Sequence, residues 1–244
     1  MKLSVIIPAL NEERVLPTTL RHTLPLGFDE ILVVDGGSSD RTYEEVEKFQ
    51  VSSFEFQPDN PKHQTQNSKL KLLTAAAGRA RQMNAGAAAA IGDVLVFLHA
   101  DTLLPLDARD ALVQGLADPG TVGGRFDLRF ERDRGLAWLI GRLITLRSRL
   151  SGIATGDQAI FVRRAAFDAL GGYAEIPIME DVEFTTRLAR RGRTAALRAR
   201  VTTSYRRWER RGPIRTILLM WSLRFLYWIG ISPSRLKALY SDER

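Results

Sequence analysis

The sequence predicts an α/β fold built on a doubly wound, mostly parallel β-sheet. Three short runs, "LSVIIP", "EILVVD" and "DVLVFLH", are apolar on both faces, which is typical of strands that helices cover on both sides. Helical stretches separate these runs, and this alternation indicates a sheet whose ligands bind beyond the carboxyl ends of its strands. With 244 residues, 45% of them apolar, the chain can bury the core of one large domain.

Local signals predict the helices of the first half. A helix is expected over 16–24, because Pro17 suits a first helical turn. Asp40 can cap a second helix, in which apolar residues recur at a spacing of three. The polar segment 57–69, which carries two prolines and a His63 expected to be solvated, predicts an exposed loop before the short strand "LKLLTA". The alanine-rich "GRARQMNAGAAAAI" predicts a third helix that stops at Gly92.

The second half is less regular. "GGRFDLRF" and "QAIFVRR" are expected to be strands, and "EDVEFTTRLARRG" a helix that ends at Gly192. The stretch 135–150 predicts an amphipathic, basic helix, and "IRTILLMWSLRFLYWIGI" predicts a long apolar one. We find no internal repeat and no linker between two large domains. The sequence therefore predicts one domain over residues 1–205, followed by a helical tail over 206–244.

Charge and composition narrow the classes of partner. The net charge is +7, and eleven arginines against one acid lie between Arg187 and Arg215, which suits phosphate-bearing or anionic partners or a merely solvated surface. Nucleic acid is the competing partner, but the strip carries no recognised nucleic-acid motif and few aromatic residues, so we expect no nucleic acid. The absence of cysteine excludes disulfides and thiolate metal sites. Only six or so apolar residues precede Asn11, too few for a signal peptide, so we expect a cytoplasmic protein.

Polar residues gather where three predicted strands end. Asn11 and Glu12 follow the first strand, "DGGSSD" from Asp35 to Asp40 follows the second, and "HADT" follows the third. If the strands are parallel, the three clusters open onto one edge of the sheet. Asp35, followed by two glycines that let backbone approach a ligand closely, could accept hydrogen bonds from a base or ribose. The same residues also suit a turn followed by a helix cap.

Five motifs, in order, resemble those of family-2 glycosyltransferases. They are "VIIPALNEE", "VVDGGSSDRT", "GRARQMNAGAAAAIGDVLVFLHADT", "GDQAIFVRR" and "MEDVEF", and the resemblance runs from Leu3 to about Gly192. The sequences of these motifs are most similar to those of a small bacterial subgroup called radical-SAM/selenodomain-associated transferases. The resemblance implies a GT-A fold and an inverting enzyme that uses a nucleotide-diphospho-sugar donor.

The resemblance also implies a metal site at the end of the third strand, where family members carry an Asp-x-Asp signature. Asp101 takes the place of the aspartate that binds a divalent cation, Mn or Mg, bridging the donor's two phosphates, and Ala100 lies beside it at the donor. The first aspartate of the signature is His99 here. His99 could bind the metal with less negative charge, contact the ribose, or only pack at the strand end.

The donor side extends over four segments. By the resemblance, Asn11, Glu12 and Asp35 lie near the nucleoside, and Pro8 and Ala9 shape its wall. Arg79 and Asn84 belong to a helix that contacts base and pyrophosphate in the family. From the residues alone, two arginines beside a helix N-terminus form a favourable place for phosphate, or else a solvated helix start.

The general base is expected at "IMEDVEF". Inverting transfer needs a carboxylate to take the proton of the acceptor hydroxyl. The resemblance assigns this role to Asp181, with Glu180 orienting the acceptor or tuning its neighbour; acids in a first helical turn also suit the helix dipole.

Two further segments complete the predicted acceptor side. Gly156, Asp157 and Gln158 resemble the family's acceptor-side motif, although a turn explains them equally well. Arg207 and Trp208 loosely match a basic-aromatic motif that some members use against the diphosphate, or form an exposed basic turn.

The tail is expected to pack on the domain or to lie at a membrane interface. Its apolar part, Ile217 to Ile231, would reach about 22 Å as a helix, short of the roughly 30 Å hydrocarbon core. Together with the basic helix over 135–150, it could make peripheral contact with the inner face of a membrane. A lipid-linked or otherwise apolar acceptor would follow from such contact.

The leading hypothesis is an inverting, metal-dependent glycosyltransferase with an unidentified acceptor. A nucleotidyltransferase would need a glycine-rich loop with a basic residue directly after the first strand, and "PALNEE" has none. A catalytically silent, GT-A-like nucleotide-sugar-binding protein, with His99 as a first sign of decay, is the alternative from another class.

Overall fold

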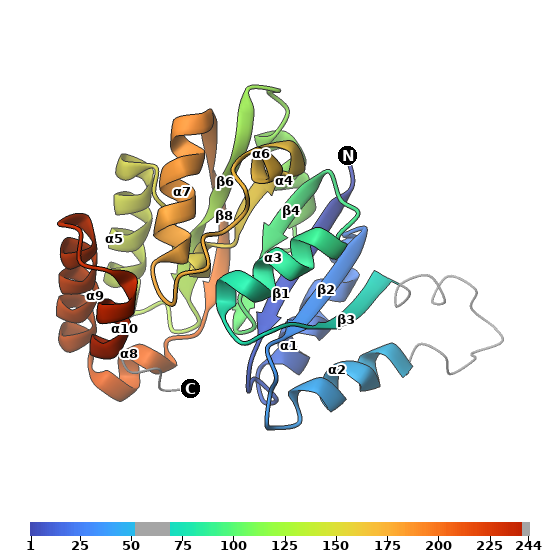
Figure 1. Ribbon diagram of the computed structural model, residues 1–244, viewed down its shortest axis with the longest axis horizontal. Helices are drawn as coiled ribbons and strands as arrows, with labels where there is room; N and C mark the ends of the chain where they lie inside the picture. Colours follow the sequence, from blue (N-terminus) through green and yellow to red (C-terminus); the bar gives the residue numbers. More distant parts are fainter. Residues whose placement is uncertain (52–68, 241–244) are drawn as a thin grey trace.

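A computed structural model of the chain describes residues 1–51 and 69–240 and has one eight-stranded sheet at its centre (Figure 1). The strands lie in the order β3-β2-β1-β4-β7-β6-β8-β5. Their bounds are β1 (Leu3–Ala9), β2 (Glu30–Asp35), β3 (Leu70–Thr74), β4 (Val94–Phe97), β5 (Thr102–Leu103), β6 (Thr121–Phe130), β7 (Ile160–Arg163) and β8 (Arg193–Thr203).

The sheet is parallel where the sequence predicts it to be. β3, β2, β1 and β4 pair in parallel, and so do β6 and β8. β7 is antiparallel to both of its neighbours, and β5 is antiparallel to β8. The sheet is therefore mixed but mostly parallel, and β1, β2 and β4 end at the same edge.

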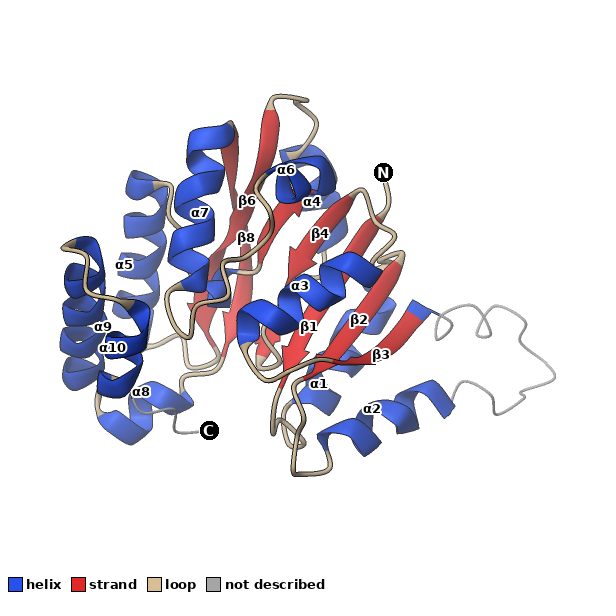
Figure 2. Cartoon of the chain, viewed as in Figure 1, coloured by secondary structure: helices blue, strands red, loops and turns tan. Residues whose placement is uncertain are grey.

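Helices cover both faces of the sheet (Figure 2). Alternate residues of β1, β2 and β4 form two apolar layers, of which one packs mainly on α1, α2, α4 and α5 and the other on α3, α6 and α7. α3 lies very close to β1 and β2, because a Cβ at Gly86 would overlap the side chain of Ile6. The α-helices are α1 (Leu16–Thr23), α2 (Thr42–Val51), α3 (Arg79–Ala89), α4 (Ala108–Gly115), α5 (Gly135–Ser151), α6 (Arg164–Ala169), α7 (Glu180–Arg191), α8 (Arg206–Arg211), α9 (Pro213–Trp228) and α10 (Pro233–Leu239), and the 3₁₀ turns are η1 (Leu24–Leu26) and η3 (Gly156–Gln158).

Most predicted elements are present, with shifted ends. The third apolar run forms a strand only over Val94–Phe97, and the alanine-rich helix stops at Ala89 rather than at Gly92. β8 is the main element that the sequence did not predict, although it holds part of the basic strip. The predicted loop over 57–69, with His63, lies almost entirely outside the described residues.

The tail folds back onto the domain. Leu223 of α9 and Leu236 of α10 are fully buried in a small cluster with Met179, the residue just before α7. Within residues 1–51 and 69–240, no helix is long and apolar enough to cross a membrane. The outer faces of α5 and α9 carry exposed apolar side chains, and contact of the tail with a membrane interface stays a prediction.

Candidate active site

The loops after β1 and β2 are joined by hydrogen bonds at the edge of the sheet. Pro8 and Ala9 end β1 in register with Val34 and Asp35 of β2. Asn11, which has a left-handed backbone with φ 56°, accepts a bond from the Ser39 amide at 2.8 Å, and its own amide donates to Ser38 Oγ at 2.9 Å. The Glu12 amide donates to Thr42 Oγ1 at 2.7 Å. These bonds fix the shape of the wall that the sequence assigns to the nucleoside.

Asp35 is nearly buried and is bonded to its own turn. Its carboxylate accepts the amides of Gly37 and Ser38 at 2.9 and 3.0 Å, as well as the Ser38 hydroxyl. The turn expected as an alternative is therefore present. A contact between Asp35 and a nucleoside stays a prediction.

Helix α3 contributes one side chain to the site and two to the scaffold. Arg79, in its first turn, forms an ion pair with Glu180 of α7 at 3.2 Å. Asn84 holds the backbone of Tyr173 through two hydrogen bonds of 2.9 Å. A contact of Asn84 with the nucleotide-sugar donor, as predicted, would have to use the side-chain amide that already binds Tyr173. Gln82, which the sequence analysis did not single out, donates to the carbonyls of Ala9 and Val34 at 2.6 and 2.8 Å. Its place in the same motif, between Arg79 and Asn84, was the available signal.

Asp101 follows β4 with a largely available carboxylate. Its nearest described partners are distant: Thr102 Oγ1 lies 3.5 Å from Oδ1, and Arg206 Nη2 lies 3.8 Å from Oδ2. Thr19 fixes the backbone just before it through a 2.6 Å bond to the Ala100 carbonyl. Arg206, from α8, belongs to the same basic-aromatic stretch as the predicted Arg207 and Trp208.

His99, Gly156 and Asp181 come together although they lie far apart in the sequence. Gly156 in η3 lies so close to His99 that a Cβ there would overlap the imidazole Nε2. The Gly156 amide donates to Asp181 Oδ2 at 2.8 Å, and the Val182 amide donates to Oδ1 at 2.7 Å. The end of β4 is thereby linked to the first turn of α7, and the Asp181 carboxylate is held by two backbone amides.

The rest of the predicted acceptor motif serves packing as well. Gln158 is fully buried, and its Oε1 accepts a 2.7 Å bond from Ser148 of α5. Asp157 lies near enough to Arg147 of α5 and Arg224 of α9 for its charge to raise the pKa of both arginines, against the stronger lowering effect of their burial. Asp157 therefore lies within electrostatic range of α5 and α9.

Glu180 is buried beside Arg79, while Asp181 is its neighbour in the chain. Burial raises the pKa of Glu180, the Arg79 charge opposes this rise, and the Asp181 charge adds to it; the net pKa is raised. Burial works to lower the pKa of Arg79, but Glu180 and Asp181 outweigh it and leave that pKa above its ordinary value. The ion pair ties α3 to α7 across the site.

Backbone strain gathers in the same loops. Among the described residues, the non-glycine positions with positive φ are Asn11, Ala159 and Met179. They follow β1, follow η3 and precede α7 respectively. Such conformations persist only where the surroundings enforce them, and they often mark functional sites. Met179 is held by Leu223 and Leu236, so the tail supports the backbone that presents Asp181.

Trp208 packs into the domain. Its ring lies 5.8 Å from that of Phe130 and stacks on Tyr205 at 6.1 Å between centroids. Arg207 belongs to α8, between Arg206 and Trp208. A contact of either residue with the diphosphate stays a prediction.

The residues fit a divalent cation only if the donor supplies further ligands. In the described part of the chain, no three His, Asp or Glu residues converge to hold an ion. Asp101 nevertheless has the weakly engaged carboxylate that Mg²⁺ or Mn²⁺ sites use, and such ions commonly combine one or two carboxylates with substrate phosphates. Asp101 would hold the ion, and His99 stays the second predicted ligand.

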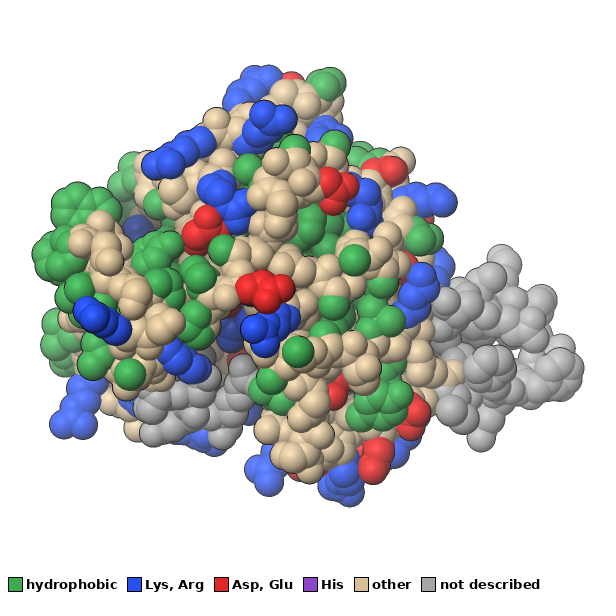
Figure 3. Space-filling model, viewed as in Figure 1, with side chains coloured by type: hydrophobic (Ala, Val, Ile, Leu, Met, Phe, Trp, Pro, Cys, Tyr) green, Lys and Arg blue, Asp and Glu red, His purple; other side chains and the backbone are tan. Residues whose placement is uncertain are grey.

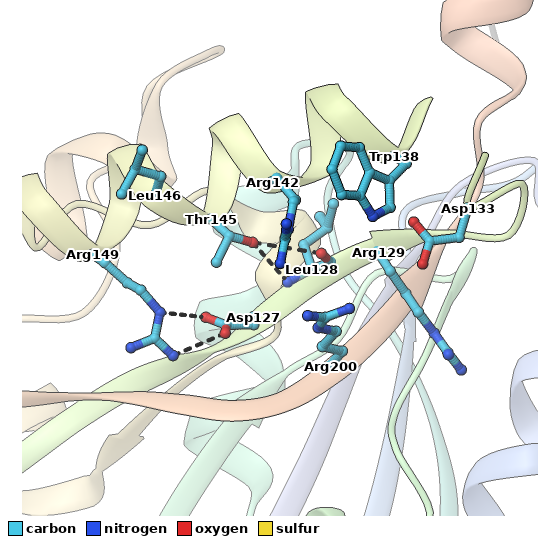
Figure 4. Close-up of a pocket in the computed structure, with 10 residues that line it drawn as sticks. All are labelled: Asp127, Leu128, Arg129, Asp133, Trp138, Arg142, Thr145, Leu146, Arg149 and Arg200. Atoms are coloured by element: carbon cyan, nitrogen blue, oxygen red, sulfur yellow. Dashed lines mark hydrogen bonds and ion pairs between the residues drawn. The ribbon is translucent and has the colours of Figure 1, made fainter. Parts of the chain in front are cut away.

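A separate hollow of about 220 Å³ lies between α5 and strands β6 and β8 (Figure 4). Its walls carry the Arg149–Asp127 ion pair and the arginines Arg129, Arg142 and Arg200. None of the predicted site residues lines it, so it is distinct from the edge of the sheet where β1, β2 and β4 end.

The family model for "Glycosyl transferase family 2" matches residues 4–171, more than half of the chain. The chain belongs to glycosyltransferase family 2. The match covers β1 to α6 and stops before α7 and the tail, so Asp181 and Arg206 lie outside it. Membership of the narrower subgroup of radical-SAM/selenodomain-associated transferases, which the motif sequences suggest, stays a prediction.

Two curated relatives agree with the family. "Probable glycosyltransferase YdaM" of Bacillus subtilis is 30% identical over an alignment of 207 positions, which covers 77% of this chain and 46% of the relative. "Undecaprenyl-phosphate 4-deoxy-4-formamido-L-arabinose transferase" of an Enterobacter strain is 32% identical over an alignment of 171 positions, which covers 66% of this chain and 48% of the relative. The chain thus spans about half the length of the curated relatives it matches.

Solved structures confirm the GT-A fold. TarS of S. aureus, residues 1–349, matches with a TM-score of 0.63 and 19% identity, over 84% of this chain and 60% of that one. A Pyrobaculum calidifontis mannosyltransferase, solved "in complex with GDP-Man and Mn2+", matches with a TM-score of 0.62 and 23% identity, over 82% of this chain and 56% of that one. At these identities the likeness concerns the fold.

Proposed function

We propose that the chain transfers a sugar from a nucleotide-diphosphate donor to an acceptor hydroxyl with inversion. The main supporting observation is the contact series His99–Gly156–Asp181, which brings a carboxylate from α7 to the sheet edge where Asp101 lies. A base for the acceptor and an anchor for the diphosphate are the two carboxylates that this transfer requires. Family membership and the solved neighbours bound to UDP, UDP-GlcNAc and GDP-Man support the donor class.

Asp181 is the proposed general base. The amides of Gly156 and Val182 hold its two oxygens, so the carboxylate is oriented before the acceptor arrives. The acceptor oxygen forms a bond to the anomeric carbon while the bond to the diphosphate breaks, and the hydroxyl proton passes to Asp181. Glu180 is engaged with Arg79 and is therefore proposed to position the site rather than to take the proton.

Asp101 is the proposed anchor of the donor. A divalent cation held there, Mn or Mg, would offset negative charge on the leaving diphosphate. Arg206, which lies near Asp101, and Arg79, which pairs with Glu180, are two cationic side chains that can contact phosphate from the protein side.

The decisive test replaces Asp181 by Asn. Asn keeps the size of the side chain but cannot take a proton, so turnover should fall about 10² to 10⁴-fold, roughly 3 to 5 kcal/mol of barrier. Donor affinity measured by calorimetry should stay near the parent value, and the exposed Asp168→Asn is the matched control. Near-normal turnover would assign the base elsewhere; donor binding by the parent without turnover on any acceptor would favour a silent nucleotide-sugar-binding protein.

A second test concerns the metal. Asp101→Ala should weaken binding of a nucleoside diphosphate in the presence of manganese at least about tenfold, because the variant loses the carboxylate that would hold the metal ion. Calorimetry with and without manganese measures this, and the exposed Asp107→Ala serves as control. Equal affinity in Asp101→Ala and the parent would remove Asp101 from the metal site. If His99 stands in for a ligand, His99→Asp should tighten metal binding.

We further propose peripheral contact with an anionic membrane, and with it an apolar or lipid-linked acceptor. Exposed apolar side chains gather on α9 and α5, which form one end of the molecule (Figure 3). Trp221, Phe225 and Trp228 of α9 are 70%, 58% and 81% exposed. The chain's surplus of arginine suits an anionic surface. One relative is named for a lipid-phosphate substrate, which supports the same acceptor class.

A further inference from the structure

Two arginines that the sequence analysis did not assign to the site lie near the candidate base. Arg147 comes from α5 and Arg224 from α9, and the two helices are neighbours at one end of the molecule (Figure 1). The charges of Asp157 and Asp181 act on both arginines, and the Arg224 charge acts on Arg147. The two side chains therefore lie within electrostatic range of each other, and both lie within range of Asp181.

Both guanidinium groups have hydrogen-bond donors to spare. Arg147 Nε and Arg224 Nη2 are buried from water and have no hydrogen-bond partner within the described part of the chain. The bond from Arg147 Nη2 to Ser148 Oγ is long, at 3.4 Å. Buried donors without partners are costly, so such groups are retained where a ligand completes them.

Other arginines of this chain, which have a structural role, have their hydrogen-bond donors paired, unlike Arg147 and Arg224. Arg164 donates three bonds of 2.8 to 3.0 Å to the carbonyls of Ala87, Ala90 and Gly92. Arg149 holds Asp127 with both ends of its fork, at 3.1 and 2.8 Å. Arg147 and Arg224 have neither a set of carbonyls nor a close carboxylate in the described residues.

The electrostatics also call for an anion at this place. Burial, followed by the charge of Arg224, lowers the pKa of Arg147 to about 10, so both side chains remain cationic at neutral pH. Two adjacent cations with free donors match a phosphate group, which offers several acceptor oxygens and up to two negative charges.

We propose that Arg147 and Arg224 form an anion subsite that binds a phosphate group carried by the acceptor. The inference rests on the proposed role of Asp181 as base, because that role makes the neighbouring space the acceptor side. The family match covers residues 4–171, so Arg224 lies outside the matched region, whereas Arg147 lies within it. A lipid phosphate and a soluble phosphate ester share this chemistry, and in either case the hydroxyl that reacts is a group separate from the phosphate held here.

The test measures binding of decyl phosphate, kept below its micelle-forming concentration, by calorimetry. Arg147→Gln/Arg224→Gln should bind it at least about tenfold more weakly than the parent, because charge-assisted hydrogen bonds are lost. Arg142→Gln/Arg235→Gln removes two exposed arginines from α5 and α10 with the same change in net charge, and should bind within about twofold of the parent. Inorganic phosphate, titrated alongside, distinguishes the sources: much weaker binding than decyl phosphate indicates a lipid phosphate, and equal binding a soluble ester.

Two results would overturn the subsite. One is unchanged decyl phosphate binding in the double variant. The other is an equal loss of UDP affinity with manganese, which would move the arginines to the donor site and leave the proposed function intact. Failure of Asp181→Asn to lose turnover would instead contradict the proposed function while the binding result stands. If the double variant does not fold, Arg224→Lys can replace it, because lysine keeps the charge but lacks the paired N–H donors of the guanidinium group. Arg224→Lys should bind decyl phosphate severalfold more weakly than the parent. Parent-like binding would overturn the subsite.

Discussion

At the scale of single residues, Gly156 is the position on which the predicted acceptor side depends most. Its missing side chain is what allows η3 to lie against His99, and its amide holds Asp181. The sequence motif was equally compatible with a turn, and the structure shows that it is both a turn and a contact. This could not have been read from the motif, since the closeness of His99 depends on how β4 and η3 pack.

Gly156→Ala should therefore lower turnover with little loss of stability. The added methyl would displace His99 or η3, and a shift of about 1 Å in the site can cost about 10²-fold in rate. Gly141→Ala is the matched control, because a Cβ there meets only ordinary contacts at 3.7 Å and α5 should gain about 0.5 to 1 kcal/mol. Steady-state kinetics and thermal melting of both variants measure the difference. Parent-like turnover in Gly156→Ala would show that the His99–Gly156 contact is dispensable.

Glu30 predicts a pH dependence of stability at the opposite end of β2. Burial alone would raise its pKa, but bonds from Ser4, the Ile91 amide and Lys71 outweigh burial and leave the pKa lowered. A carboxyl with a lowered folded-state pKa contributes stability above its unfolded-state pKa and loses it as the pH falls through the folded-state value. Glu30→Gln should thus cost about 1 to 3 kcal/mol at pH 7 and progressively less on acidification.

Chemical denaturation measures this dependence if the free energy of unfolding of Glu30→Gln is compared with that of the parent at two pH values. One is pH 7, and the other is roughly pH 3 to 4, around and below the ordinary pKa of glutamate. The exposed Glu44→Gln should show no comparable loss at either pH. A cost that is independent of pH would mean that the charge of Glu30 is not what its partners stabilise.

At the scale of elements, strands with strong apolar runs were predictable and the basic strand was not. β1 and β2 carry uninterrupted apolar residues that signal burial on both faces. β8 has arginines at alternate positions near its middle and is mostly half-exposed, so its hydrophobic pattern is weak. Its pairing with β6 over nine residue pairs, a tertiary contact, determines its conformation.

Helix α9 carries the prediction that belongs to this scale. The parent protein should sediment with vesicles of phosphatidylcholine and phosphatidylglycerol at low salt. Replacement of Trp221, Phe225 and Trp228 by Ser should abolish sedimentation while leaving the melting temperature nearly unchanged, because all three side chains are more than half exposed.

Leu223→Ala provides the contrast on the same helix. Leu223 is 1% exposed, and its truncation should cost about 2 to 5 kcal/mol while leaving the outer face intact. If the melting temperature of the triple Ser variant falls as far as that of Leu223→Ala, the side chains of Trp221, Phe225 and Trp228 contribute to the core rather than to a membrane-binding face. Unchanged sedimentation of the triple variant would contradict membrane contact through α9.

At the scale of the whole molecule, the convergence of the site was predictable only in part. Parallel strands ending at one edge follow from the order of strands and helices, so the grouping of Asn11, Asp35 and Asp101 was expected. The position of Arg224 within electrostatic range of Asp181 depends on how the tail folds back, which periodicity does not encode. Arg224 showed itself in the sequence only as a charge that interrupts an apolar helix.

The two-residue strand β5 has a consequence for the order in which the protein folds. Thr102, next to Asp101, pairs with Thr203 of β8, and their hydroxyl oxygens lie 3.0 Å apart across 101 positions of sequence. Contacts between segments so far apart in the sequence form slowly, and β8 must be made before this pairing can exist, so we expect the segment around Asp101 to become ordered late. During synthesis, the ability to bind a nucleotide should consequently emerge late, after β1 and β2 are already paired. Nucleotide binding would then report completed folding of this chain, whereas secondary structure would not.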